Sequence, residues 1–273
     1  MVFTQSETMF FNDFSIDVFN FDFYFYYLGG VIRLNKLTDL LKSSRHTVVF
    51  TGAGMSTESG LPDFRSPSRG LWARFNPDEL ANIDALETNQ DEFLEFYRYR
   101  LNDIKDISPH EGHYILAEWE KEGLIDGIVT QNVDGFHHDA GSENVMEIHG
   151  TFRSLYCHDC GKEQDHEAYR EGAVHCSCGG PIRPGIVLFG ETLPQDTFLK
   201  AEEITMQADL FIVLGSSLSV TPANMFPMLA EQNGANLVIV NREPTPFDSH
   251  ATCVIQDTGI RDVLMETNQI LKS

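Results

Sequence analysis

The sequence predicts an α/β fold built on a doubly wound, parallel, Rossmann-like sheet with a small module inserted into it. Three observations support this prediction. Short segments rich in Val, Ile and Leu alternate with amphipathic segments of helical length, which is typical of a parallel sheet covered by helices. A Gly-rich turn directly follows the first apolar segment. Four cysteines within 22 positions then interrupt the alternation.

The elements of the body follow from these patterns. Helices are predicted at 35–44, 91–100 and 110–122, where apolar residues recur at helical spacing. Buried strands are predicted at 47–51, 127–130, 210–214 and 236–240. A polar or Gly-rich segment follows each strand, and right-handed crossovers bring these strand ends to one edge of the sheet. We therefore expect the ligand site at that edge.

Composition limits the class of partner. The 273 residues are 42% apolar, as in globular proteins, and carry a formal net charge of −22. Such a surface repels phosphates, so we expect no nucleic-acid or membrane partner. There is no apolar run of about 20 residues and no basic residue before Arg33, which argues against a transmembrane helix or a signal peptide. We expect a cytoplasmic protein, with a monomer favoured and the oligomeric state left open.

The N-terminal segment differs from the rest. Residues 1–28 hold eleven aromatic residues and the remaining 245 hold 19. The segment has no helical period, no alternation and no capping signal. Two interpretations stay open: an added apolar arm that packs on a groove or partner, or an upstream non-coding stretch translated in frame, with Leu34 as the true start. We place a boundary after residue 30, assign 31–273 to the catalytic domain, and expect no function in 1–30.

The Gly-rich turn Gly52-x-Gly54 lies between a strand and a helical segment. A Gly pair lets the backbone approach a pyrophosphate, and a helix N-terminus offers free N–H groups to it. Thr57 replaces the third Gly of the dinucleotide fingerprint, and no acidic residue ends a following strand as that fingerprint requires. An ordinary tight turn is the alternative.

The cysteines are spaced as two close pairs, Cys157-x2-Cys160 and Cys176-x-Cys178. Four thiolates in two pairs suit a tetrahedral, closed and therefore structural zinc site. This predicts a small zinc-binding module at about 153–184. The Cys-x-Cys pair is tighter than usual, so substitution of a ligand by His158, His166 or His175 stays open, as do four unrelated thiols. The fifth, Cys253, lies in an apolar stretch and is predicted to be a core residue.

His149 lies between the second polar strand end and the cysteines. A histidine at such an edge is suited to be a general base, because its pKa is near neutrality. A structural role is the alternative for a single histidine.

Taken in order, these motifs resemble the sirtuin family, the NAD-dependent protein-lysine deacylases. The resemblance runs from about residue 37 to 271. The segments that carry it are Gly52–Arg65, Thr130–Gly135, His149–Gly150, Arg183–Glu191, Gly215–Leu218 and Val240–Glu243. It departs from the family at Val133, where Ile is usual, and at Ser216, where Thr is commoner.

The resemblance implies a role for each of these residues. The dinucleotide pocket would be lined by Gly52, Ala53, Gly54, Thr57, Asp63 and Arg65, with Phe64 shielding the reacting ribose. Gln131 and Asn132 would bind the ribose beside nicotinamide, and Val133 and Asp134 the nicotinamide amide. The adenosine half would be held by Gly215, Ser216, Ser217, Asn241, Arg242 and Ile260.

The resemblance also implies the reaction. The oxygen of an acyl-lysine would attack the ribose carbon as nicotinamide leaves, with His149 as general base on a ribose hydroxyl and Asn132 as the second catalytic residue. The products would be free lysine, nicotinamide and an O-acyl-ADP-ribose. The acyl-lysine peptide of a protein substrate would lie as an added strand against Val187, Phe189, Gly190 and Val220.

One segment bears on the acyl group. Tyr97-x-x-Arg100 resembles the Tyr/Arg pair of desuccinylase-type sirtuins, and Ala81 falls where those enzymes carry a small residue. An Arg and a Tyr hydroxyl could bind the carboxylate of a succinyl or malonyl group. The alternative is a helix with Tyr97 in the core and Arg100 in solvent. Two other functions stay open: protein ADP-ribosyl transfer, and a non-catalytic NAD-sensing module, against which the presence of His149 argues.

Overall fold

The centre of the fold is a six-stranded sheet in a computed structural model that describes residues 18–63 and 76–273. The strand order is β3-β2-β1-β6-β7-β8, and every neighbouring pair is parallel. The strands are β1 (Thr47–Thr51), β2 (Gly127–Thr130), β3 (Val145–Glu147), β6 (Leu210–Leu214), β7 (Asn236–Val240) and β8 (Cys253–Ile255). The four predicted strands therefore occur at their predicted positions. The order reverses between β1 and β6, and a ligand site is expected at such a switch point.

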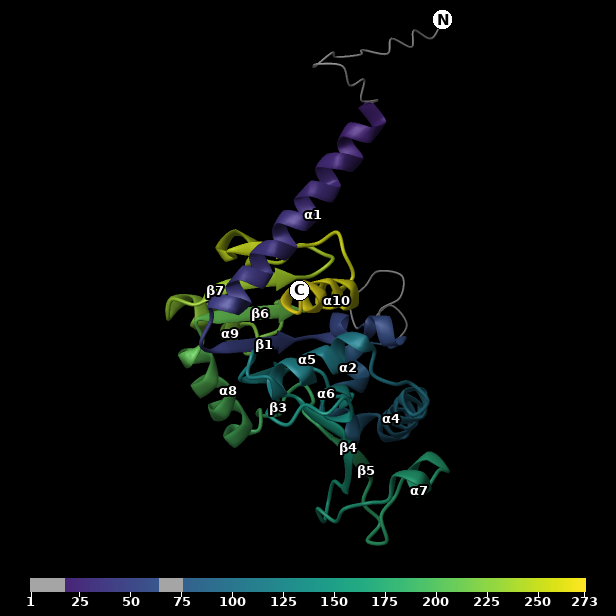
Figure 1. The fold of residues 1–273 in the computed structure, drawn as a ribbon. Helices are drawn as coiled ribbons and strands as arrows, with labels where there is room; N and C mark the ends of the chain where they lie inside the picture. The colour runs from purple at the N-terminus through teal and green to yellow at the C-terminus, as the bar shows by residue number, and fades with distance from the viewer. Residues whose placement is uncertain (1–17, 64–75) are drawn as a thin grey trace, which may run out of the picture.

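Helices cover both faces of the sheet, as predicted for a doubly wound fold (Figure 1). Successive residues of a strand point to opposite faces, so Val49 packs on one side and Phe50 on the other. The Val49 side is covered by α1 (Val18–Ser43), α5 (Glu111–Lys121) and α10 (Ile260–Leu271). The Phe50 side is covered by α8 (Gln195–Gln207) and α9 (Met225–Gln232). Cys253 is buried in β8, which confirms it as a core residue.

Helix α1 is longer than the sequence predicts. It begins at Val18 and not at residue 35, so it runs into the segment for which no helix is predicted. Its last turns are anchored by Leu34, Leu37 and Leu41, which are buried against the sheet. Once a helix is anchored in this way, each added residue brings one more backbone hydrogen bond, so extension needs no amphipathic pattern of its own.

The inserted module extends away from the sheet at the end nearest β3 (Figure 1). It contains the antiparallel pair β4 (Gly150–Cys157) and β5 (Ile182–Ile186) and the short helix α7 (His166–Arg170). Its apolar residues share one core cluster with α4 (Gln90–Ile104), which contains the helix predicted at 91–100. The remaining short elements are η1 (Ala53–Ser59), α2 (Pro77–Leu80), α3 (Ala85–Thr88), α6 (Phe136–Asp139) and η3 (Asp248–His250).

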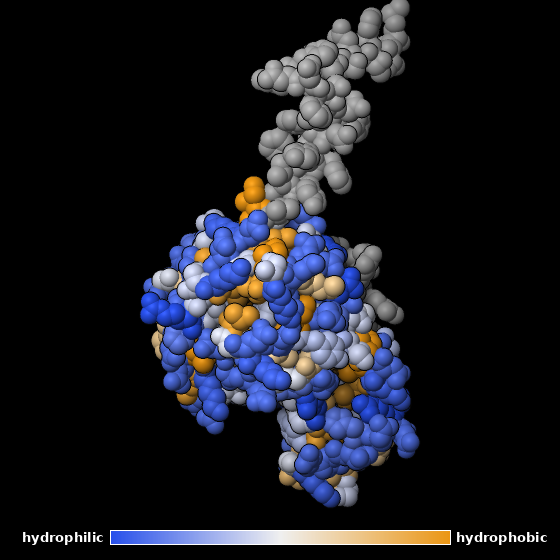
Figure 2. Space-filling model, in the orientation of Figure 1, coloured by the Kyte–Doolittle hydropathy of each residue, from blue (hydrophilic) through white to orange (hydrophobic). Residues whose placement is uncertain are grey.

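The face of the molecule in Figure 2 is mostly hydrophilic, with smaller hydrophobic areas between. Among the described helices, none combines the length and the apolar character that a bilayer span requires.

Three buried histidines lie in a row behind the Gly-rich turn. The ring of His113 lies 4.4 Å from that of His110 and 5.1 Å from that of His137, centroid to centroid. His110 Nε2 donates to the Met55 carbonyl at 2.6 Å, and His137 Nε2 bonds Thr51 Oγ1 at 2.9 Å. Burial lowers the pKa of His113 to about 2 and that of His137 to about 3, and it also lowers the pKa of His110. The row is therefore neutral in the native protein.

We predict that the free energy of unfolding falls as pH drops below about 6.5. Below that pH the histidines of the unfolded chain bind protons, whereas the buried row in the native protein stays neutral. Each such proton contributes a slope of about 1.4 kcal/mol per pH unit. His113→Phe keeps the ring packing against Phe136 and removes one titrating group, so it should flatten the slope. Urea unfolding between pH 4 and 8 measures this. His250→Phe, at an exposed ring, is the control; equal slopes for both variants and wild type would contradict the prediction.

Candidate active site

A cavity of about 570 Å³ opens at the carboxyl edge of the sheet, where the switch point predicts it. It runs from the turns after β1, β6 and β7 past the end of β2 to the inserted module. Most of the predicted site residues line it: Gly52, Ala53, Gly54, Asp63, Ala81, Tyr97, Arg100, Gln131, Asn132, Val133, His149, Val187, Phe189, Gly190, Gly215, Ser216, Ser217, Val220 and Asn241.

The conformation of the Gly-rich turn after β1 is set by its contact with the turn after β6. A Cβ on Gly54 would lie 2.7 Å from the Cα of Gly215, and one on Gly52 would lie 2.7 Å from the Gly215 carbonyl oxygen. Gly54 N donates to that carbonyl at 2.9 Å. The two glycines are therefore needed where the chain segments leaving β1 and β6 meet. The backbone N–H groups of η1 start beside this contact, which fits a site for pyrophosphate.

A hydrogen-bonded network lies at the end of β2. Ser56 Oγ donates to Asp134 Oδ2 at 2.7 Å, and Asn132 Nδ2 donates to Ser56 Oγ at 3.3 Å. Phe136 N donates to Asp134 Oδ1 at 3.0 Å. Burial raises the pKa of Asp134, and the bonds from Phe136 and Ser56 oppose that shift. The network holds the Asn132 amide at the cavity wall.

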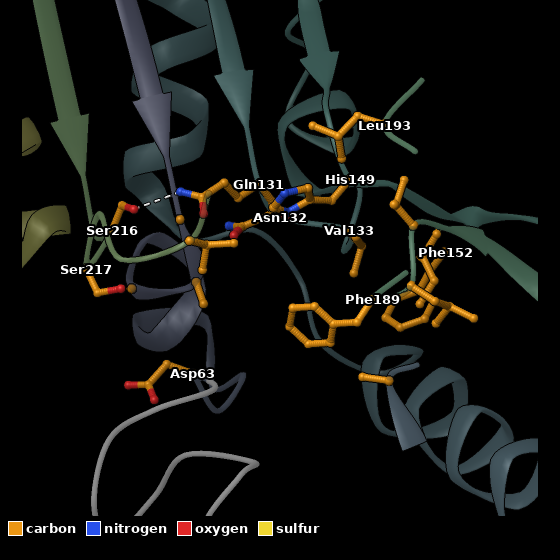
Figure 3. A pocket seen from close by; sticks show the side chains of 18 of the residues that line it. Asp63, Gln131, Asn132, Val133, His149, Phe152, Phe189, Leu193, Ser216 and Ser217 are labelled. Carbon is orange, nitrogen blue, oxygen red and sulfur yellow. Dashed lines mark hydrogen bonds between the residues drawn. The ribbon is translucent and has the colours of Figure 1, made fainter. Parts of the chain in front are cut away.

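His149 faces the same part of the cavity as Gln131 and Asn132 (Figure 3). Its Nδ1 lies 3.2 Å from the Gln131 carbonyl oxygen. A carbonyl only accepts, so Nδ1 carries the hydrogen and Nε2 keeps its lone pair. Burial lowers the pKa of His149, and the Gln131 bond partly opposes this. His149 is therefore a neutral imidazole at pH 7, with a basic nitrogen available for proton transfer.

The other end of the cavity is polar and lies over β6 and β7. Gln131 Nε2 donates to Ser216 Oγ at 2.7 Å, the dashed line in Figure 3. Asn241 Nδ2 donates to the Glu243 carbonyl at 2.6 Å, and Glu243 also lines the cavity. Hydroxyl, amide and carboxylate groups here can hydrogen-bond a ribose and a base, so this end fits the adenosine half of a dinucleotide.

Four predicted residues do not line the cavity. Thr57 Oγ1 donates back to the Gly54 carbonyl at 2.9 Å. Asp134 is turned toward Ser56, Arg242 is exposed, and Ile260, the first residue of α10, is buried in the core. Tertiary contacts turn Asp134 and Ile260 away from the cavity, whereas Thr57 is turned away by a local bond within η1. Phe64 and Arg65 lie outside the described residues.

Sequence reasoning left some site residues without a role. Ser56 organises the network, and Glu191 and Glu243 line the cavity; all three lie inside the motifs of the resemblance, which was the available signal. Phe152 and Leu193 also line it, but they lie in segments with no motif.

Tyr97 and Arg100 are both buried at the module end of the cavity. Arg100 is 5% exposed, so the alternative with Arg100 in solvent is wrong. Its guanidinium carbon lies 5.8 Å from the centroid of Phe152. Burial raises the pKa of the Tyr97 hydroxyl and lowers the pKa of Arg100. Ala81 leaves room at this wall, which also includes Phe96 and Phe152.

The segment from Val187 to Gly190 closes one side of the cavity. Phe189 N donates to the Ala81 carbonyl at 2.7 Å, and Ile83 N donates to the Phe189 carbonyl at 3.0 Å. Val187 N donates to the carbonyl of His149 at 2.8 Å. Phe189 forms a parallel bridge with Asn82, and the segment lies next to the base, which suits peptide binding by strand addition.

The four cysteines converge at the far end of the module. Their sulfur atoms all lie within 4.8 Å of one another. Cys157 and Cys178 are 3.5 Å apart, and Cys160 and Cys176 are 3.8 Å apart, Sγ to Sγ. A tetrahedron with Zn–S bonds of 2.3 Å has edges of about 3.8 Å. The cysteines therefore fit a structural zinc ion, the close Cys-x-Cys pair included, and no histidine belongs to the cluster.

The comparisons agree with this geometry. A model of the Sir2 family matches residues 52–222. The NAD-dependent protein deacetylase 1 of Geobacillus kaustophilus is 55% identical over 235 residues, which cover 86% of this chain and 97% of that protein. A structure presented as the basis for the mechanism and regulation of Sir2 enzymes has a TM-score of 0.82 at 39% identity, covering 88% of this chain and 98% of that one.

A second solved structure contains a Sir2 variant with a deacetylated p53 peptide and 3'-O-acetyl ADP ribose. It has a TM-score of 0.81 at 37% identity and covers 88% of this chain and 98% of that one. The doubly wound sheet with a cavity at its switch point defines a nucleotide-binding α/β protein. The chain belongs to the Sir2 family.

We predict that any reaction catalysed at this site requires the neutral form of His149. Its pKa is lowered from 6.5, so kcat/KM should be flat near pH 7 and fall only below about 6.5, as the imidazole gains its proton. His149→Ala should lower kcat by about 10² to 10⁴. Initial rates between pH 5 and 8 measure this, with melting temperature recorded at each pH to exclude unfolding. A half-maximal point above pH 7 would contradict it.

Proposed function

We propose that this protein is an NAD-dependent protein-lysine deacetylase. The observation that carries the proposal is His149, whose Nε2 is free for proton transfer in a cavity shared by the Gly-rich turn and the segment Val187–Gly190. One end of that cavity suits a dinucleotide and the other an extended peptide. The relative from Geobacillus kaustophilus is named NAD-dependent protein deacetylase 1, and it matches over nearly its whole length.

NAD supplies an ADP-ribosyl group, to which the acyl oxygen of the lysine adds as nicotinamide leaves. The chain's own residues have three tasks. Asn132, held by Ser56, orients the ribose beside the nicotinamide. His149 Nε2 would accept a proton from a ribose hydroxyl, so that this oxygen can attack the acyl carbon. The lysine amine would then leave with a proton, and one water would add to the acyl carbon to give the O-acyl-ADP-ribose. The buried ring of Phe152 lines the cavity and limits the access of water to the ribose carbon that loses nicotinamide.

The remaining roles complete the proposal. The pyrophosphate is assigned to the turn Gly52–Gly54, where the glycines and Ala53 let the backbone approach it, with Asp63 in the same cavity. Phe64 is assigned to shielding the reacting ribose and Arg65 to the dinucleotide pocket; both lie outside the described residues. Val133 lines the cavity at the nicotinamide end, and Asp134 acts there through its bond to Ser56, which holds Asn132. Ser216, Ser217 and Asn241 hold the adenosine. Four cysteines, Cys157, Cys160, Cys176 and Cys178, hold the structural zinc, which takes no part in the chemistry.

A second acyl class is favoured by one observation. Arg100 is buried and lines the acyl end of the cavity beside Tyr97. A guanidinium and a phenol there could pair with the carboxylate of a succinyl or malonyl group. We therefore propose removal of acidic acyl groups as a further activity of the same site.

We propose a cytoplasmic location and acyl-lysine side chains of proteins as substrates. The five free cysteines suit a reducing compartment, and the net charge of −22 disfavours nucleic acid. ADP-ribosyl transfer to protein, and NAD sensing without turnover, are the outcomes that the following measurement would separate from deacylation.

We predict that acetyl-lysine and succinyl-lysine peptides lose their acyl groups only when NAD is present, with one acyl-ADP-ribose formed for each nicotinamide released. Mass spectrometry of the complete reaction measures every product. ADP-ribose on the peptide or on the enzyme would identify a transferase instead. Binding of NAD with no product at all would identify a sensor.

We predict that Arg100→Met lowers the rate of desuccinylation at least about tenfold more than that of deacetylation, because only the acidic acyl group needs the cation. The ratio of the two kcat/KM values measures this. Arg98→Met is the matched control: it removes the same charge from the same helix, at a residue that does not line the cavity. Equal losses of both activities in Arg100→Met would remove acidic acyl groups from the proposed function.

A further inference from the structure

An ion pair between a buried arginine and a partly exposed glutamate joins the module to the peptide-binding segment. Arg183 lies in β5, and Glu191 directly follows the segment Val187–Gly190. Arg183 Nη1 donates to Glu191 Oε1 at 2.7 Å, and Nη2 donates to Oε2 at 2.8 Å. Arg183 is 1% exposed and is one of the largest fully buried side chains described. Such two-point pairing fixes the relative orientation of both groups.

Each partner also bonds the backbone between them. Arg183 Nη2 donates to the Ile186 carbonyl at 2.7 Å, and Glu191 Oε2 accepts from Leu188 N at 2.8 Å. These two groups flank Val187, whose own N–H is bonded to the carbonyl of His149. The ion pair therefore sets the backbone on both sides of the residue that joins the segment to the catalytic base.

The cation is anchored in the module. The guanidinium carbon of Arg183 lies 5.5 Å from the ring centroid of Tyr156, its cross-strand partner in β4. The next residue after Tyr156 is the zinc ligand Cys157. Leu188 is in the same core cluster as Cys157 and Tyr97. The segment is therefore held from the module by Arg183, in addition to its bonds to His149 and Ala81, while the turns at the dinucleotide end belong to the sheet.

We propose that Arg183 and Glu191 are positioning residues for the acyl-peptide: they shape the segment Val187–Gly190 and so determine peptide binding, without acting on NAD. The proposal rests on the proposed function for the identity of the peptide. Without the Glu191 carboxylate, the buried Arg183 cation has no counter-ion, and the bond to Leu188 N weakens. Without the Arg183 guanidinium, the two-point pairing and the bond to the Ile186 carbonyl are lost. The segment should then lose the extended shape that strand addition requires.

The test uses the full chain with Glu191→Gln and Arg183→Lys. We expect KM for an acetyl-lysine peptide to rise at least about tenfold, while KM for NAD changes less than about twofold. Two readouts do not need turnover: fluorescence anisotropy of the labelled peptide, and hydrogen exchange at the Leu188 amide, which should lose protection. Glu167→Gln is the matched control, because it breaks an exposed Arg170 pair in the same module.

A double variant separates positioning from folding. Arg183→Met with Glu191→Leu leaves no buried charge, so the melting temperature should recover relative to the single variants. The bonds to Ile186 and Leu188 stay absent, so peptide KM should remain raised. Recovery of peptide KM together with the melting temperature would overturn the proposal, as would equal rises in the KM of peptide and NAD.

The two proposals fail differently. If the wild-type protein does not deacetylate the peptide, the proposed function fails, and exchange at the Leu188 amide still reports whether the ion pair holds the segment. If the wild type is active and the single variants bind peptide unchanged, the positioning role is wrong while the proposed function stands.

Discussion

The contact between the turns after β1 and β6 is the constraint on which the rest of the site depends. The strand order reverses between these two adjacent parallel strands. Their turns touch at Gly52, Gly54 and Gly215, where a Cβ would lie within 3 Å of the backbone. The reversal of strand order at this point opens the carboxyl edge of the sheet to a ligand. The contact between the two turns also brings Ser216 within hydrogen-bonding distance of Gln131 from the neighbouring β2. Side chains far apart in sequence thereby face one cavity.

The cavity is made by two units with different physical support. Parallel strands and two apolar layers hold the turns of the sheet, so core packing supports the polar end of the cavity. The module has only a two-stranded ladder and one short helix, and it shares its core with α4. A pair of strands is only marginally stable by itself. We therefore attribute the remaining stability of the module to its four cysteines and to the ion pair between Arg183 and Glu191. The shared core with α4 and the ion pair also determine where Tyr97, Arg100 and the segment Val187–Gly190 lie.

The electrostatics of the site are local and do not follow from the net charge. A surface at −22 would by itself favour protonated histidines, because nearby negative charge raises the pKa of an imidazole. Burial outweighs this at His149 and in the row of His110, His113 and His137, which stay neutral. Desolvation acts on each ring directly, while exposed carboxylates are screened over about 10 Å.

The sequence by itself determined the layers, the positions of the main strands and the motifs of the family, because these depend on local apolar runs and on residue types such as Gly and Cys. It did not predict β3 and β8, which are too short to show a period. Only the tertiary structure turned Ile260 and Asp134 away from the cavity and buried Arg100 within its wall. It alone placed Glu191 against Arg183 and Ser56 between Asn132 and Asp134. Where a side chain points depends on contacts between distant segments, which a pattern along one chain does not contain.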